Sequence, residues 1–94
     1  MADKLYLVKI DAYNCYDVYD SAIIQCESRD VLDQLIENKA FSDSFFNDNI
    51  DSSRFNFHIA SYQKVESIEY IGDAVLPRKD GKTAMILCSS FNAG

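Results

Sequence analysis

The sequence predicts an α+β fold in which a mostly antiparallel sheet of four to five strands is packed on one face by a single main helix. Three observations support this fold. Several short segments alternate apolar and polar residues, one segment repeats apolar residues at helical spacing, and an Asp-Gly pair precedes the last apolar segment. The chain has 94 residues, of which 48% are hydrophobic and 26% charged, which is typical of a single globular domain over residues 1–94.

The first two strands are expected before the helix. In residues 4–10, two leucines alternate with Tyr6, Val8 and Ile10, which predicts a strand covered on one face and partly covered on the other. Residues 21–27 hold a short apolar run bounded by polar residues, as is typical of a central strand.

The helix is expected over residues 29–39. Ser28 can accept a hydrogen bond at the helix N-terminus, and Asp30 places a negative charge in the first turn. Polar residues on the opposite side predict that this side lies in water. The apolar stripe expected to pack on the sheet consists of Val31, Leu32, Leu35 and Ile36.

Residues 41–61 contain many phenylalanines but no sustained period. They predict at most a short helical turn over residues 42–46 and a short strand over residues 54–59. The aromatic residues of this region divide into a group expected to close the end of the core and a group that could form a ridge or line a pocket. The first group is Phe41, Phe45 and Phe46, and the second is Phe55, Phe57 and Tyr62.

Two more strands are expected in the last third of the chain. Residues 65–71 alternate, and the Gly-Asp pair that follows predicts a bend. The Asp-Gly pair at positions 80–81 predicts a tight hairpin that leads into a last strand over residues 83–89.

The chain is acidic, with a net charge of −6 and a pI near 4.5. Residues 1–51 hold eleven acids and four bases, whereas residues 52–94 hold four acids and five bases. This balance argues against direct binding to nucleic acid or to an anionic membrane surface. The acidic half could imitate a track of phosphates toward a basic partner, or it could simply be a solvated surface. The sequence shows neither a secretory signal nor a long apolar stretch, so we expect a cytoplasmic protein.

The sequence offers little for catalysis or for binding a metal or cofactor. Cys15, Cys26 and Cys88 lack metal-ligand spacing, and the last two lie in apolar runs where a free thiol packs as a small hydrophobic group. His58 is the only histidine, and the three glycines cannot build a phosphate-binding loop. We therefore expect no enzyme, no metal and no cofactor.

The loop expected over residues 11–20 combines tyrosines with aspartates. This composition is typical of a protein interface, because tyrosine buries a large area at low entropic cost. The alternative is that Tyr19 and one other tyrosine hold the loop against the edge of the sheet. The residues predicted to bind a partner are Tyr13, Tyr16, Asp17, Tyr19 and Asp20.

A second hypothesis is a small-molecule site. The less acidic second half of the chain could combine an aromatic pocket with a few cations and so sequester a nucleotide signal. The residues predicted for this ligand site are Arg54, Phe57, His58, Arg78 and Lys79.

Three segments resemble a family of small phage and prophage proteins: residues 16–24, YDVYDSAII; residues 65–74, VESIEYIGDA; and residues 89–94, SSFNAG. Members of that family have a Tyr-Asp-x-Tyr-Asp-Ser element before the second strand, a Val-x-x-Ile-Gly-like strand and a terminal Ser-Phe-Asn-Ala-Gly. Between residues 41 and 62 this chain departs from the family, which has a tryptophan and a Pro-Glu turn there.

The resemblance implies a phage setting but no particular activity. Small acidic phage proteins without catalytic motifs often bind a host protein or a component of a defence system, and the acidic first half is compatible with that role. We therefore expect a non-catalytic binding module whose partner is a host or defence-system protein. A minor virion or assembly component is an alternative, and a homodimer could form through an open edge of the sheet.

Overall fold

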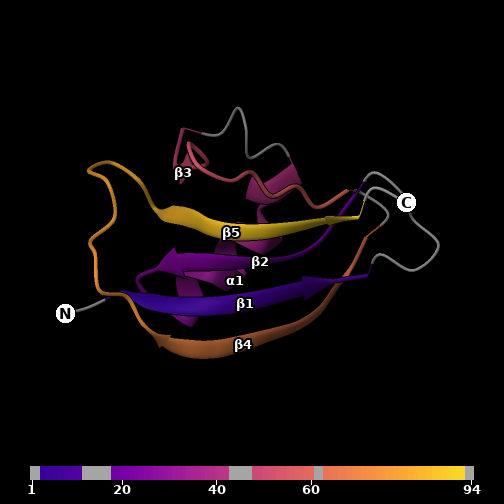
Figure 1. Ribbon diagram of the computed structural model, residues 1–94, viewed down its shortest axis with the longest axis horizontal. Coiled ribbons are helices and arrows are strands. Elements are labelled where there is room, and N and C mark those ends of the chain that lie inside the picture. The colour runs from indigo at the N-terminus through magenta and orange to yellow at the C-terminus, as the bar shows by residue number, and fades with distance from the viewer. Residues whose placement is uncertain (1–2, 12–17, 43–47, 61–62, 93–94) are drawn as a thin grey trace.

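The computed structural model describes residues 3–11, 18–42, 48–60 and 63–92. In this part of the chain it contains β1 (Lys4–Ile10), β2 (Val18–Cys26), α1 (Arg29–Glu37), β3 (Ile50–Asp51), β4 (Val65–Asp73) and β5 (Ala84–Asn92). The strands form one five-stranded sheet in the order β3-β5-β2-β1-β4, with α1 behind it in Figure 1. Neighbouring strands are antiparallel, except that β3 and β5 are parallel. The predicted α+β fold with a mostly antiparallel sheet is confirmed.

The core lies between α1 and one face of the sheet. Alternation along β1 places Tyr6, Val8 and Ile10 on this face, and all three are buried. The predicted strand with one covered face is confirmed, and this is the covered face. Leu32 of α1 is fully buried against these side chains. The remaining buried members of the core come from β2, β3, β5 and the segments around β3: Ala22, Ile24, Cys26, Phe41, Ile50, Phe57, Ala84 and Ile86.

The helix begins at the predicted residue and ends at Glu37 rather than at residue 39. Ser28 Oγ accepts a hydrogen bond from the Val31 backbone N–H at 3.4 Å, which satisfies one of the free donors of the first turn. Beyond the helix, Lys39 has a φ of 59°, a left-handed conformation that cannot continue an α-helix. The predicted apolar stripe does pack on the core.

The prediction of a strand over residues 54–59 is wrong. Residues 55–60 have no regular secondary structure, and the strand of this region is the two-residue β3. Phe57 is fully buried here, and the Ile59 backbone N–H donates to the Phe41 carbonyl at 3.0 Å. Packing of Phe57 and this hydrogen bond therefore help to hold the segment against the core.

β1 has the predicted bounds, whereas β2, β4 and β5 are longer than the sequence pattern predicts. β2 begins at Val18, and β5 continues to Asn92. β4 continues to Asp73, so the bend expected at Gly72 is instead a strand position with a φ of 150°, which a glycine adopts readily.

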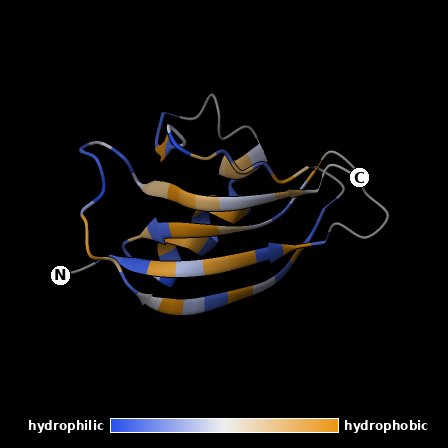
Figure 2. Ribbon diagram, in the orientation of Figure 1, coloured by the Kyte–Doolittle hydropathy of each residue, from blue (hydrophilic) through white to orange (hydrophobic). Residues whose placement is uncertain are grey.

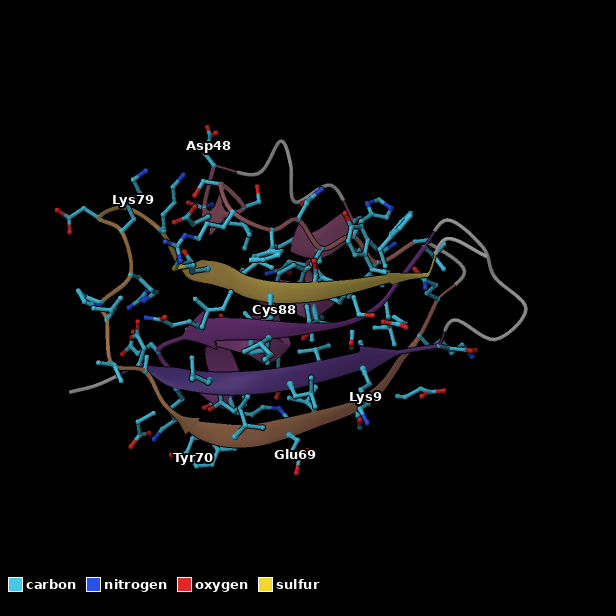
Figure 3. All side chains as sticks on the ribbon, in the orientation of Figure 1. Lys9, Asp48, Glu69, Tyr70, Lys79 and Cys88 are labelled. Carbon is cyan, nitrogen blue, oxygen red and sulfur yellow. The ribbon has the colours of Figure 1, made fainter. Side chains whose placement is uncertain are left out.

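Cys26 and Cys88 lie in different surroundings. Cys26 is buried in the core, and burial raises the pKa of its thiol to about 11. Cys88, expected to be buried, is exposed and points to the front in Figure 3. The strand register explains this exposure. Ile24 of β2 pairs with Ile86, but the preceding Ile23 pairs with Cys88, so Leu87 is an extra residue in β5. The extra residue in β5 shifts its alternation and turns Cys88 away from α1.

Candidate protein-binding surface

Three of the residues predicted to bind a partner lie outside the described residues: Tyr13, Tyr16 and Asp17. Tyr19 lies in β2 and packs against the core, with its ring centroid 6.0 Å from that of Phe57 and 4.9 Å from that of Phe91. Asp20 accepts a hydrogen bond from Ser21 Oγ at 3.3 Å. Tyr19 thus has a packing role, and an interface role for this group stays a prediction.

The residues predicted for a small ligand are distributed over several places. Phe57 is fully buried in the core, whereas Arg54 and His58 are exposed. Arg78 and Lys79 line a hollow of about 530 Å³ beside the segment that joins β4 to β5, and the other three residues do not line it. A shared ligand site for all five residues stays a prediction.

The segment that joins β4 to β5, residues 74–83, is here called the strap. At its start Val75 is 96% exposed and Leu76 is 74% exposed, while Tyr70 and Ile71 at the end of β4 are about half exposed. Figure 2 shows the strap changing from hydrophobic near β4 to hydrophilic before β5. Exposed apolar residues are usually scattered, so the group within residues 70–76 is a candidate interaction surface.

The backbone at the start of the strap is fixed by Asp3, the residue before β1, and by Gln25 of β2. The Ala74 backbone N–H donates to the Asp3 carbonyl at 2.8 Å. Gln25, which is 2% exposed in β2, donates from Nε2 to the Leu76 carbonyl at 2.7 Å. Two hydrogen bonds therefore hold the chain on either side of the exposed Val75.

The second half of the strap is held by Arg78. Its Nη1 donates to the Lys82 carbonyl at 2.9 Å and to the Thr83 carbonyl at 3.1 Å. The hairpin predicted from the Asp-Gly pair is wrong, because β5 pairs with β2 and β3 and not with β4. The pair instead lies in a turn that the Lys82 backbone N–H closes by donating to the Lys79 carbonyl at 3.1 Å. Gly81 supplies the positive φ of 81° that this turn needs. The strap is a long connection with a tight turn near its end.

Asp3 joins the two halves of the strap. Its Oδ2 accepts from Gln25 Nε2 at 3.0 Å and from Arg78 Nε at 2.8 Å. The side chains of Asp3 and Arg78 are only 11% and 25% exposed, so the ion pair is shielded from water. Burial raises the pKa of Asp3, but the hydrogen bonds from Arg78 and Gln25 and the charge of Arg78 outweigh it and hold the pKa below its usual value.

We expect acid to weaken this network. Because the pKa of Asp3 is lower in the folded chain than its ordinary value of 3.8, the unfolded chain binds more protons between the two values. The stabilisation by Asp3 is complete above the ordinary pKa and is lost as the pH falls through the folded pKa. Urea unfolding from about pH 5 to about pH 2 should show a smaller loss of stability for Asp3→Asn than for the wild type. Equal losses would contradict this role of Asp3.

Sequence reasoning missed Gln25 and Asp3. Gln25 interrupts the apolar run from Ala22 to Cys26, and a polar residue inside a central strand needs a hydrogen-bond partner. That need was a usable signal, although it does not name the partner. Asp3 gave no comparable signal, because its partners are 22 and 75 positions away in the sequence.

Within the described ranges, no group of three or more His, Cys, Asp or Glu side chains is placed to hold a metal ion. The one α-helix described is too short and too polar to cross a membrane. Comparisons with protein-family models, with curated proteins and with solved structures give no match to this chain.

Proposed function

We propose that this protein is a non-catalytic protein-binding module that uses the strap and the adjoining end of β4 to hold a host or defence-system protein. One observation carries the proposal: Val75 and Leu76 extend into water from a backbone that hydrogen bonds hold on both sides. Covering such a side chain contributes about 1.5–3 kcal/mol. A loop that is already ordered loses little conformational entropy when it binds.

The proposal is tested by capture from a lysate of a bacterial host, with the chain tagged at its C-terminus because β5 ends far from the strap (Figure 1). We expect a stoichiometric protein to be retained by the wild type and lost with Val75→Ser/Leu76→Ser. Both side chains are exposed, so the double variant should still fold.

Phe55→Ser is the matched control, because Phe55 is also apolar and 43% exposed but lies outside the strap and β4. It should retain the same captured protein. Equal capture by all three chains, or no stoichiometric protein with the wild type, would contradict the proposed function.

A second candidate is the sequestration of a nucleotide signal, favoured by the hollow of about 530 Å³ beside the strap. Arg78, Lys79 and Lys82 line this hollow together with Asp3 and Asp80, so cations outnumber carboxylates there. Denaturing the purified chain and analysing what it releases distinguishes the two candidate functions. Release of an equimolar nucleotide on denaturation, with no captured protein, would replace the first candidate by the second.

A further inference from the structure

β4 is the outermost strand on one side of the sheet. It has nine residues and pairs only with β1. Among the described residues, none forms a backbone hydrogen bond with the outer side of β4. Glu69 and Tyr70 stand at this outer edge in Figure 3. An edge of this length offers a row of backbone donors and acceptors to another extended chain.

The two faces of β4 differ in chemistry at this edge. Ile68 and Tyr70 face Val8 and Tyr6 across the pair and so lie on the side of α1. Ile68 is partly buried and Tyr70 is 51% exposed, so this apolar row is incompletely covered. Glu69 lies on the opposite face.

The acids of the edge strand are Glu66, Glu69 and Asp73. Asp73 is already engaged, because its Oδ1 accepts from the Tyr70 hydroxyl at 2.6 Å and lies 3.8 Å from Lys4 Nζ. Glu66 and Glu69 are exposed and form no ion pair with another described residue. Two carboxylates on this strand are therefore available to a cationic partner.

The same acids oppose pairing of β4 with β4 of a second copy. Such a pair would bring the three carboxylates of each strand into one interface, although each chain already carries a net charge of −6. Like charges across a strand pair are destabilising, and acidic edge residues are a known means of preventing self-association. Charge complementarity instead favours a basic strand.

We infer that β4 accepts an extended, basic segment of the partner protein as an added strand, an inference that rests on the proposed function. Alternate side chains of the added strand are apolar and cover Ile68 and Tyr70. The side chains between them are lysine or arginine and meet Glu69 on the opposite face, while Glu66, at the register shift near the start of β4, adds to the negative charge of the edge. The exposed Val75 and Leu76 continue the apolar contact beyond the end of β4. The partner is recognised by an alternation of basic and apolar residues.

A synthetic heptapeptide of alternating Lys and Val tests this inference, with the wild-type chain in low salt and amide resonances followed by NMR. We expect the largest shifts at residues 65–73. A peptide with Glu in place of Lys should cause no such shifts. In Glu66→Gln/Glu69→Gln, affinity for the Lys peptide should fall about tenfold. Glu27→Gln/Glu37→Gln, which removes two exposed acids away from β4, should bind as the wild type does.

The inference is overturned if the Lys peptide leaves the resonances of β4 unchanged, or if removing Glu66 and Glu69 does not weaken binding. It is also overturned if sedimentation shows a dimer of the wild-type chain whose β4 amides are protected from hydrogen exchange, because a second copy would then occupy the edge. None of these outcomes decides the protein-binding function, which is judged separately by capture with Val75→Ser/Leu76→Ser. If that variant loses the captured protein but the wild-type chain does not bind the Lys peptide, the protein-binding function is supported and the addition of a strand to β4 is rejected.

Discussion

Replacing Phe57 by alanine should lower the free energy of unfolding by about 3–5 kcal/mol, a large part of the total of about 5–15 kcal/mol for a domain of this size. Phe57 is fully buried, and its ring centroid lies 5.7 Å from that of Phe41 and 6.0 Å from that of Tyr19. Alanine would leave a cavity between these rings, which the surrounding core can close only in part. Urea unfolding followed by circular dichroism measures the loss.

The control for Phe57→Ala is Phe55→Ala, since Phe55 is two residues away but 43% exposed. It should change the stability by less than about 0.5 kcal/mol. A loss below about 1 kcal/mol for Phe57→Ala would show that the residue does not hold the core together, and its predicted ligand role would then regain weight.

Replacing Arg78 by alanine should lower the free energy of unfolding by about 2–3 kcal/mol. The variant removes three hydrogen bonds and leaves the poorly exposed Asp3 carboxylate without its cation. The strap should also open locally, so the backbone amides of Ala74 and Lys82 should exchange with solvent faster than in the wild type. Denaturation and hydrogen exchange measure the two effects.

Combining Arg78→Ala with Asp3→Asn tests whether the two groups act together. The double variant has no unpaired carboxylate, so its loss should be smaller than the sum of the two single losses by about 1–2 kcal/mol. Lys79→Ala is the control, because it removes a neighbouring exposed cation of the same hollow. Additive losses would show that Asp3 and Arg78 do not hold the strap as a pair.

The elements predicted most accurately are those whose signals are local. The alternation of residues 4–10 and the Ser28 cap with its apolar stripe depend on neighbours within a few positions, and both match the structure. The prediction of a strand over residues 54–59 is wrong, because Phe57 and Ile59 pack against the core without the segment pairing with a strand. The expectation that Cys88 is buried is wrong, because a shift of register in β5 turns this residue to the other face of the sheet. Nothing in the apolar run of that strand indicates the shift.

The candidate site was harder to predict than the fold. Only Arg78 and Lys79 of the predicted site residues lie on the strap, and Arg78 there contacts Asp3 and two backbone carbonyls. The exposure of Val75 and Leu76 cannot be derived from their types, since Ala-Val-Leu-Pro in sequence is as consistent with a buried turn. It follows from the contacts of Gln25 and Asp3, which are distant in sequence.

Hydrogen exchange of the wild-type chain, free and with the protein captured from the lysate, tests the binding surface most directly. Slower exchange is expected at the backbone amides of residues 65–76 in the complex, with residues 29–37 of α1 unchanged. Protection centred on α1 or on the region around Tyr19, with residues 65–76 exchanging as in the free chain, would contradict the account. The partner would then bind at α1 or at Tyr19 rather than at β4 and the strap.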